Sequence, residues 1–459
     1  MRPARRRVKA LWICAPALSL FLSSCGISTE FTRSLDAHVA MGDYGDAVET
    51  VRDHREAYGD KSSVLYSLDM GLLFHYAGQM DSSTAYLLAA EREIEELYTK
   101  SVSLEAMSLL LNDNVLPYEG EDFEKVLVNV FLALNFAEKG EEDEAVVEAR
   151  KVDLKLREYA RQYEGKNAYQ EDAFARYLAG VLYESNGEIN DAFISYRKAY
   201  EAYETYATQF GTVAPDCLLD DLVRTAGRLG FTEDALHYQE LGGKAVDRSD
   251  ISTGSLVVVA YAGLSPLKSE VRTSVSIPDN DGTIHTFQIA LPKFTPRYAG
   301  SRTYAVQVRG NRDSLVIGSA QTRLAEDVTA IASRVLDDRL ALVYLKSGGR
   351  ALLKFLAAEQ AKAAIKKSGG GSESGGRGGN TLANLLGSLA LDIAIGATEK
   401  ADVRTWRTLP AQFQISRLML QPGAYTVRVE SSDGEYSLPA EAVTIRAGKT
   451  TFLLVDDIR

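Results

Sequence analysis

Residues 174–199 read FARYLAGVLYESNGEINDAFISYRKA, and this stretch decides the fold class of the first half of the chain. Apolar residues recur in it at intervals of three and four, which is the spacing of one face of an α-helix. Gly187 interrupts the pattern, and glycine is the residue that most often follows the end of a helix. The stretch therefore predicts two helices that turn back on each other at Gly187.

The turn signal of this stretch recurs along the chain between about residue 31 and residue 243. In each copy a glycine is followed two residues later by a side chain that is usually bulky, and three residues after that by a small one. The five turn glycines are Gly42, Gly78, Gly140, Gly187 and Gly230, at spacings of 36, 62, 47 and 43 residues. Repetition at such periods predicts an array of helix pairs.

These copies resemble the tetratricopeptide repeat family. In that family the glycine ends the first helix of a pair, and the small residue lets the second helix approach closely. Gly71 and Gly180 lie seven residues before a turn glycine, at the small position of the first helix. The aromatic position is filled by Phe74, Phe136 and Tyr183, and the last small position by Ala90 and Ala199. The intervals exceed the family period of about 34 residues, which indicates inserted turns. A non-repetitive helical bundle is the alternative.

The resemblance also implies a concave surface lined by the first helix of each pair. The positions that face it in the family are occupied here by Leu68, Leu72, His75, Tyr76, Val130, Leu134, Glu138, Tyr177, Val181 and Glu184. Apolar and aromatic centres with acidic or imidazole edges suit a helix or an extended peptide. We expect His75, Tyr76, Glu138, Tyr177 and Glu184 to form a partner-binding groove, and we expect the leucines and valines to be core residues.

A Tyr-Glu-Gly turn occurs twice, at residues 118–120 and 163–165, each at a similar distance before a turn glycine. It is consistent with a ligand loop over the groove or with a packed connecting turn. The second interpretation is favoured because glycine marks a backbone requirement first.

The N-terminus has the order of a bacterial lipoprotein signal. The basic run Arg5-Arg6-Arg7 precedes an apolar stretch at residues 10–22, which is too short to span a bilayer. Leu22-Ser23-Ser24-Cys25-Gly26 follows and resembles the lipobox, in which the cysteine is acylated. The resemblance implies a signal peptide at residues 1–24, lipid (palmitate) on Cys25 and a lipidated tether at residues 25–30. A conventional signal peptide is the alternative.

The residue after Cys25 is Gly26 and not aspartate, so the sorting pattern points to the outer membrane, with the chain expected to face the periplasm. The formal charge of the whole chain is −12, and removal of the five basic side chains in residues 1–24 leaves −17. This acidity disfavours a nucleic-acid binder, which replaces counterions with Lys and Arg. It also disfavours electrostatic adhesion to anionic lipid, so we expect acyl chains to supply the membrane anchor.

After a linker at residues 247–254 the periodicity changes to two. Strands are predicted at residues 256–259, 283–289, 304–308, 413–415, 425–429 and 450–455. Short strands in this number favour a small β-sandwich within residues 254–459. The predicted fold class is therefore α + β and multidomain, with a tetratricopeptide-like helical solenoid over residues 31–245 followed by this β-rich domain.

A helical insertion at residues 321–400 is expected between the strands. It contains a Gly/Ser linker at residues 368–380 and an apolar segment at residues 382–397. Asp392 would be costly in hydrocarbon, and the segment is short for a membrane span. A helical hairpin is therefore favoured, and contact of residues 382–397 with a membrane or another subunit is left open.

The chain as a whole resembles a family of little-characterised bacterial outer-membrane lipoproteins with a tetratricopeptide-like N-terminal domain and a β-rich C-terminal domain. The stretches that carry the resemblance are residues 116–124 (LPYEGEDFE), 191–200 (DAFISYRKAY) and 401–410 (ADVRTWRTLP). Members of this family tend to occur beside small lipoproteins of the curli-export and peptidoglycan-synthase-activator type. The resemblance therefore implies a role in the cell envelope, with such proteins as candidate partners.

Motifs for catalysis are sparse. The five histidines are scattered, so no zinc ligand set is predicted. Ser265 and Lys268 match a Ser-x-x-Lys pattern without its companion motifs, and Gly448-Lys449-Thr450 is expected to be a turn and not a phosphate loop. Cys217, the one cysteine left after Cys14 and Cys25, is expected to be a buried, inert thiol. No catalytic residue, metal or cofactor is predicted.

These observations lead to three hypotheses. The first is an outer-membrane lipoprotein adaptor, not an enzyme, that binds envelope proteins through the groove and the membrane through Cys25. The second is an accessory subunit of an envelope export or pore-forming complex. The third and weakest is a cell-wall enzyme, since only Ser265 and Lys268 suggest it.

Overall fold

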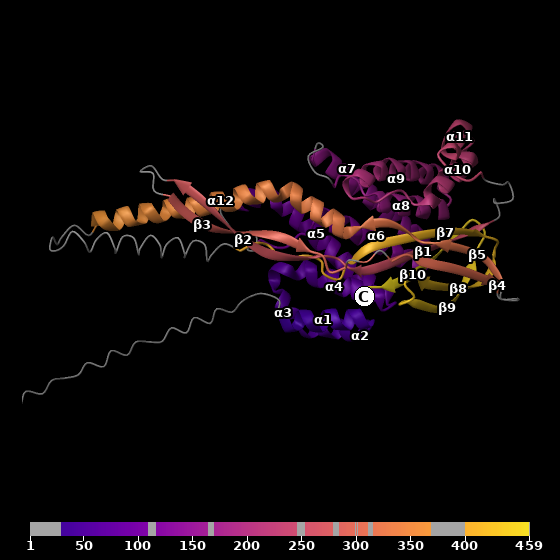
Figure 1. Cartoon of the computed structure of the whole chain (residues 1–459), viewed down its shortest axis with the longest axis horizontal. Coiled ribbons are helices and arrows are strands. Elements are labelled where there is room, and N and C mark those ends of the chain that lie inside the picture. Colours follow the sequence, from indigo (N-terminus) through magenta and orange to yellow (C-terminus); the bar gives the residue numbers. More distant parts are fainter. Residues whose placement is uncertain are drawn as a thin grey trace, which may run out of the picture.

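The chain forms an array of helices, two β-sheets and a long arm (Figure 1). The computed structural model describes residues 29–108, 116–163, 169–245, 253–278, 284–298, 300, 302–310, 315–368 and 400–458. The helices of the first half are α1 (Thr29–Met41), α2 (Tyr44–Asp53), α3 (Arg55–Tyr58), the 3₁₀ turn η1 (Asp60–Ser62), α4 (Ser63–Tyr76), α5 (Met80–Ser108), α6 (Asp122–Glu138), α7 (Glu142–Tyr163), α8 (Ala173–Ser185), α9 (Ile189–Gln209), α10 (Asp216–Leu229) and α11 (Thr232–Glu240).

The turn glycines lie where the chain reverses between two helices. All five have φ between +70° and +84°, a left-handed conformation that is unfavourable for other residues. At Gly187 the turn is closed by bonds from its own N–H to Glu184 O at 3.0 Å and from Glu188 N–H to Tyr183 O at 2.8 Å. Consecutive helices pack on each other along the array. The helical half is therefore tetratricopeptide-like, and the predicted helix pairs are confirmed.

The small residues of the first helices allow the close approach that the repeat requires. A Cβ atom at position 71 would lie 2.6 Å from a methyl carbon of Leu87 on α5. A Cβ atom at position 180 would overlap the ring of Tyr196 on α9. Glycine at these two positions is therefore a packing requirement of the α4–α5 and α8–α9 pairs.

The second half contains two four-stranded sheets and a two-stranded hairpin among its described residues. The strands are β1 (Gly254–Leu264), β2 (Leu267–Pro278), β3 (Ile284–Thr295), β4 (Tyr304–Gly310), β5 (Val316–Gln321), β6 (Arg323–Asp327), β7 (Pro410–Leu420), β8 (Gly423–Ser431), β9 (Ser437–Ile445) and β10 (Thr450–Asp457). One sheet has the order β10-β1-β7-β6 and the other β5-β4-β8-β9, while β2 pairs with β3. β1 and β10 run parallel, and the other pairs are antiparallel.

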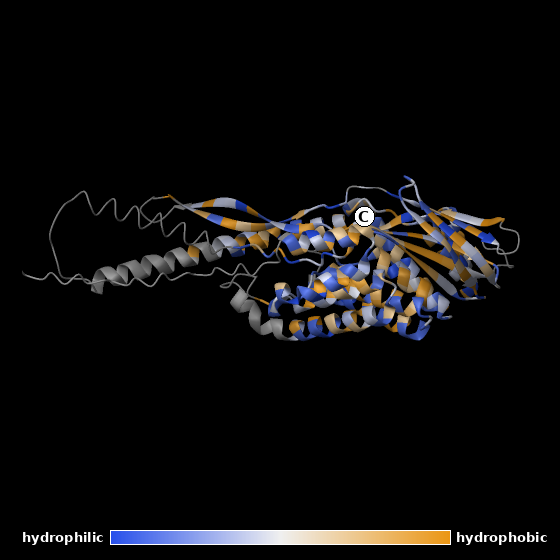
Figure 2. Cartoon of the chain, turned by 90° about the horizontal axis from the view of Figure 1, so that it is seen from below, coloured by the Kyte–Doolittle hydropathy of each residue, from blue (hydrophilic) through white to orange (hydrophobic). Residues whose placement is uncertain are grey.

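Strand β1 is buried on both faces. Val257, Val259 and Tyr261 belong to the large apolar core that it shares with the helices. The alternate residues, among them Leu256 and Val258, belong to a second core shared with β4, β8 and β10. Because successive side chains of a strand point to opposite faces, one strand joins both cores. In Figure 2 the strands next to the helices are mostly apolar in colour.

The arm consists of β2, β3 and α12 (Val328–Ser368), which extend to one side of the body (Figure 1). Phe294 of β3 belongs to the same core as Ile331 and Val335 near the start of α12. Farther along α12, Leu342 and Leu345 are exposed. The arm is therefore anchored in the core at its base and presents apolar side chains to solvent beyond it.

Several predicted boundaries can be compared with the structure. The described residues of all six predicted strand segments fall in observed strands, residue 283 lying outside the described part, although β2, β5, β6 and β9 were not predicted. The insertion predicted at 321–400 is corrected, because β6 occupies residues 323–327 and the helix begins at Val328. Helix α1 begins at Thr29, inside the predicted tether. The predicted signal peptide, Cys25, the linker beyond Ser368 and residues 382–397 lie outside the described residues.

Among the described residues, no helix combines the length and the apolar character that a membrane crossing needs.

The close approach at Gly180 can be tested by adding one methyl group. We expect Gly180→Ala to lower the free energy of unfolding by about 1–3 kcal/mol, because the Cβ would overlap Tyr196. The matched control is Gly227→Ala in α10, where a Cβ meets nothing within 4 Å. The control should be neutral or raise stability by about 0.5–1 kcal/mol. Denaturant unfolding of both variants measures the difference, and equal stabilities would contradict the proposed packing.

Candidate functional site: the concave face and the adjoining cleft

The concave side of the helical array is covered by the sheet of β10, β1, β7 and β6. Helices α6 and α8 contact β10, and α8 also contacts β6. Tyr76, at the end of α4, donates a hydrogen bond to Thr408 O at 2.9 Å, just before β7. All thirteen residues of α8 are buried, as expected for a helix with packing partners on every side.

A chain of hydrogen bonds through His75 joins four elements. The Tyr261 hydroxyl of β1 donates to His75 Nε2 at 2.9 Å, and His75 Nδ1 donates to Asn135 Oδ1 at 2.6 Å. Asn135 Nδ2 then donates to Ser83 Oγ at 2.8 Å. Burial lowers the pKa of His75 to about 4, so the imidazole is neutral near pH 7. A neutral imidazole offers one donor and one acceptor, which is what this chain uses.

The five predicted groove residues occupy different environments. His75, Tyr76, Tyr177 and Glu184 are only 2%, 5%, 0% and 6% exposed, and all four contact residues of the chain itself. Glu138 lies on the surface at the end of α6 and lines a cavity with residues of β9 and β10. The expectation of an open groove is therefore corrected. The apolar inner faces of the helices are buried against the apolar face of the chain's own sheet.

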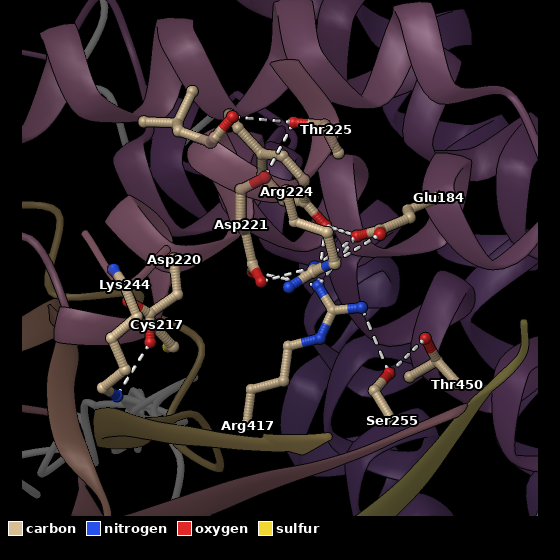
Figure 3. Close-up of polar contacts among 12 residues, drawn as sticks. Glu184, Cys217, Asp220, Asp221, Arg224, Thr225, Lys244, Ser255, Arg417 and Thr450 are labelled. Atoms are coloured by element: carbon tan, nitrogen blue, oxygen red, sulfur yellow. Dashed lines mark hydrogen bonds and ion pairs between the residues drawn. The ribbon is translucent and has the colours of Figure 1, made fainter. Parts of the chain in front are cut away.

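A buried ionic cluster fastens the sheet to the last part of the array (Figure 3). Arg417 of β7 lies 3.1 Å from Glu184 Oε2 and 2.9 Å from Asp221 Oδ2. Arg224 of α10 binds the same two carboxylates, at 2.8 and 2.6 Å. Tyr196 donates to Glu184 at 2.8 Å. Burial alone would raise the pKa of Glu184, but Arg224 and Arg417 hold it well below its usual range.

The geometry of the ionic cluster determines the position of the sheet relative to the helical array. Two carboxylates from α8 and α10 meet two guanidinium groups, one of which comes from the sheet. Breaking a buried pair leaves a charge without compensation, which commonly costs about 3–5 kcal/mol. The cluster therefore holds the sheet and the helical array in one relative position, and its role is structural.

The carboxyl groups of Asp456 and Glu138 have the opposite electrostatics, because their pKa values are raised. Asp456 of β10 has no hydrogen-bond partner for Oδ1, and its pKa is raised to about 8 by burial and by Glu138. The pKa of Glu138 is raised to about 6 by burial and by Glu441. Carboxyl groups that raise the pKa of a neighbouring carboxyl thus lie where α6 meets β9 and β10.

An open cleft of about 390 Å³ lies beside the filled concave face, at the base of the arm. It is lined by α5, the loop at residues 116–121, the start of α6, β2, β3, α12 and the segment 400–404. Its apolar lining includes Leu97, Phe123, Pro292, Leu336 and Val343. The volume falls in the range of about 300–1,000 Å³ that is usual for ligand sites.

Charged side chains lie among the apolar ones in this cleft. Lys268 forms an ion pair with Glu121, and Arg339 contacts Glu121 and Asp122, each at 2.8 Å. Burial alone would raise the pKa of Glu121, but Lys268 and Arg339 lower it to about 2. The lining contains five cationic side chains, Lys268, Arg339, Lys346, Lys400 and Arg404, and three acidic ones, Glu119, Glu121 and Asp402. The cleft is thus locally cationic on an acidic chain.

The first Tyr-Glu-Gly turn forms part of the cleft wall. Tyr118 N–H donates to Lys61 O at 2.8 Å, and the Tyr118 hydroxyl donates to Glu124. Arg404 lies over the Tyr118 ring, 5.3 Å from its centroid. The turn is therefore packed, as the favoured interpretation predicts, and it also lines the cleft. Residues 164 and 165 of the second copy lie outside the described part of the chain.

The Ser-x-x-Lys pattern, the Gly448 turn and Cys217 can each be compared with the structure. Ser265 donates to Trp406 O at 3.2 Å, whereas Lys268 pairs with Glu121. Gly448 forms the predicted turn, with φ of +68°, and its N–H donates to Thr253 O. Cys217 is half-buried, and burial raises the pKa of its thiol to about 12, which disfavours the thiolate. Within the described residues, no three His, Cys, Asp or Glu side chains form a group that could hold a metal ion.

No protein-family model matches the sequence, and no curated protein matches it. Among solved structures, BtubC from P. vanneervenii is similar at 14% identity and a TM-score of 0.33, covering 48% of this chain and 83% of that one. MamA of AMB-1 is similar at 17% identity and a TM-score of 0.29, covering 46% and 87%. A putative kinesin light chain with TPR-like repeats from Podosopora anserina is similar at 13% identity and a TM-score of 0.29, covering 46% and 91%.

The buried carboxyl of Asp456 predicts a pH dependence of stability. An acid whose pKa is about 8 in the folded chain keeps its proton at pH values where the unfolded chain, with a pKa near 3.8, has lost it. The contribution of Asp456 to the free energy of unfolding therefore falls as pH rises from about 4 to about 8. Asp456→Asn should abolish this fall and raise stability at pH 8 relative to the parent.

The control for this experiment is Asp53→Asn, because Asp53 is exposed. Its stability profile should parallel that of the parent chain across the same pH range. Chemical denaturation at pH 5 and pH 8 measures all three proteins. A parent-like slope in Asp456→Asn would contradict the assignment of the slope to Asp456.

Proposed function

We propose that the chain is an outer-membrane lipoprotein adaptor, facing the periplasm, that binds envelope proteins through the cleft at the base of the arm. The observation that carries this proposal is the contrast between two surfaces. The concave face is filled by the chain's own sheet, whereas the cleft of about 390 Å³ beside it is open. A partner that used the concave face would first have to displace the sheet.

The chemistry of the cleft suits an acidic partner segment with apolar side chains. Apolar residues from α6, β3 and α12 supply hydrophobic contact, and cationic side chains such as Lys346 supply charge complementarity. The remainder of the chain is acidic and would repel such a partner, so the cleft is the favoured surface. Small lipoproteins of the curli-export or peptidoglycan-synthase-activator type are the candidate partners that the family resemblance suggests.

The anchor in this proposal is Cys25. Its support is the order of the basic run, the apolar stretch and the Leu-Ser-Ser-Cys-Gly segment. Two or more acyl chains on one residue give the stable attachment that a single chain does not. The net negative charge of the chain disfavours electrostatic attraction to anionic lipid, so the proposal assigns the attachment to acyl chains.

An accessory subunit of an export or pore-forming complex is a second candidate. It is favoured by the exposed apolar side chains of the arm, such as Leu342 and Leu345 on α12, which lie outside the cleft. In that case the arm would contact other subunits, and the cleft would be secondary.

Photo-crosslinking in cells tests the cleft. A p-benzoylphenylalanine placed at Val343, which lines the cleft, should capture an envelope protein. The matched control carries the same group at Leu236 on α11, which is 54% exposed and far along the helical array from the cleft. Capture by Val343 alone supports the adaptor. Capture of the same protein at both positions, or none at Val343 with capture at Leu342, would contradict the cleft.

Membrane fractionation tests the anchor. We expect Cys25→Ser to leave the membrane fraction and to lose metabolically incorporated palmitate, because the thiol carries the lipid. The control is Cys217→Ser, which should stay in the membrane fraction since that thiol is half-buried in the folded chain. Retention of Cys25→Ser with its lipid would refute the anchor without affecting the cleft.

A further inference from the structure

The arm leaves the body at the end where helix α1 begins. Phe31, near the start of α1, packs against Tyr58 of α3, with 5.9 Å between the ring centroids. Just after α3, the carbonyl oxygen of Lys61 accepts hydrogen bonds from Tyr118 N–H at 2.8 Å and from Arg404 at 3.1 Å. Tyr118 and Arg404 line the cleft at the base of the arm. The start of α1 and the base of the arm are therefore neighbours, and Figure 1 places α3 and the arm toward the same end of the molecule.

The proposed lipid anchor belongs to this same end. Cys25 precedes Thr29, the first residue of α1, by four residues. A fully extended chain advances about 3.5 Å per residue, so the backbone of an acylated Cys25 would lie within about 14 Å of the start of α1. The membrane surface would then face the end of the body from which the arm extends.

The arm is much longer than this tether. Helix α12 has 41 residues, which corresponds to about 60 Å at a rise of about 1.5 Å per residue. Figure 1 shows that α12 continues past α3, away from the body. Its base is held in the core, so its direction relative to the body is fixed. An arm that starts beside the anchor and extends this far comes within reach of the membrane.

Apolar side chains face solvent along one flank of α12. Leu342 and Leu345 are 53% and 70% exposed. Gly349 and the half-buried Leu352 follow at intervals of four and three residues, which keeps all four positions on one side of the helix. At the far end of the hairpin, Ile284 of β3 is 67% exposed. A row of exposed apolar groups of this kind marks a contact site.

The outer part of α12 is also cationic. Residues 342–368 contain six Lys or Arg residues and one acidic residue, Glu359, which gives a net charge of +5 on a chain of −12. A basic helix with an apolar flank is typical of binding at an anionic membrane surface. The same charges would be costly in hydrocarbon, so a helix of this composition lies on the surface. Anionic headgroups therefore match the arm, although they do not match the chain as a whole.

We propose, on the basis of the anchor proposed at Cys25, that the arm lies on the surface of the membrane that holds this cysteine, with Leu342 and Leu345 between anionic phospholipid headgroups. This second contact fixes the orientation of the body, whereas a lipid tether alone leaves it free to rotate. It also holds the cleft at the base of the arm close to the bilayer, which favours partners that are themselves attached to the membrane. Another protein subunit is the competing occupant of the flank.

Quenching by labelled lipid tests the contact in the full-length, lipidated chain. Because Cys14 leaves with the signal peptide and Cys25 carries lipid, a Cys217→Ser background leaves no thiol. Leu345→Cys then takes a single NBD fluorophore. The matched control is Leu236→Cys on α11, which is 54% exposed in the parent and lies far from the arm (Figure 1). In vesicles of phosphatidylethanolamine and phosphatidylglycerol, nitroxide-labelled lipid should quench the fluorophore at 345 at least about two-fold more strongly than the one at 236.

A change of lipid tests the role of charge. Replacing phosphatidylglycerol with phosphatidylcholine should lower the quenching at 345 by at least about two-fold, because fewer anionic headgroups hold the arm. Quenching that does not change would contradict the assignment to anionic headgroups. Thermal unfolding checks that both labelled proteins are folded.

Flotation with the vesicles separates failure of the arm contact from failure of the anchor. If both labelled proteins float and the quenching at 345 and 236 is equal, the arm contact is wrong and the anchor stands. If neither protein floats, the anchor and the arm contact are both wrong. A fluorophore at 345 that is shielded in native membranes but not in vesicles would assign the flank to a protein subunit and overturn the lipid contact.

Discussion

The structure depends on one constraint, namely that the inner face of the helical array is apolar and must be covered. Helices α4, α6 and α8 are buried along nearly their whole length. A helix that is apolar on all sides is stable in water only when packing partners surround it. The sheet through β1 supplies the missing partner, and a single core extends from Phe31 in α1 to Ile458 near the C-terminus. The helical half and the β-rich half therefore share one hydrophobic core, although their sequence periodicities differ.

Polar contacts at this interface determine where the sheet lies. Hydrophobic burial is non-directional and would accept several positions of the sheet on the helices. The hydrogen bonds of His75 and the ionic cluster around Arg417 each require particular partners from both halves. A sheet shifted by one residue would point Arg417 and Tyr261 to the wrong face, because strand side chains alternate. Because the burial of these polar groups costs desolvation free energy, they add little net stability. They do select one register of the sheet on the helices.

The sequence predicted the helix pairs well, because their signals are local. A glycine that must adopt positive φ and a small residue that must admit a neighbouring ring are both set by adjacent helices. The six predicted strands have continuous or alternating apolar patterns of their own. Strands β5 and β9 were missed because their residues are mostly exposed, so neither has a clear period of two. The helix start at Val328 was misplaced because β6 is only five residues long.

The site was harder to predict because it depends on contacts between distant segments. Nothing near Glu184 in the sequence indicates that Arg417 will meet it, and Lys268 and Glu121 are equally far apart. One local signal did exist, since α4 and α8 are apolar on the face that a groove would expose to water. A groove that binds partners reversibly must be stable when empty, whereas this face carries too much apolar surface for that. The same residues that suggested an open groove therefore indicate a covered one, and this is why the proposed partner binding is assigned to the cleft that the chain leaves open.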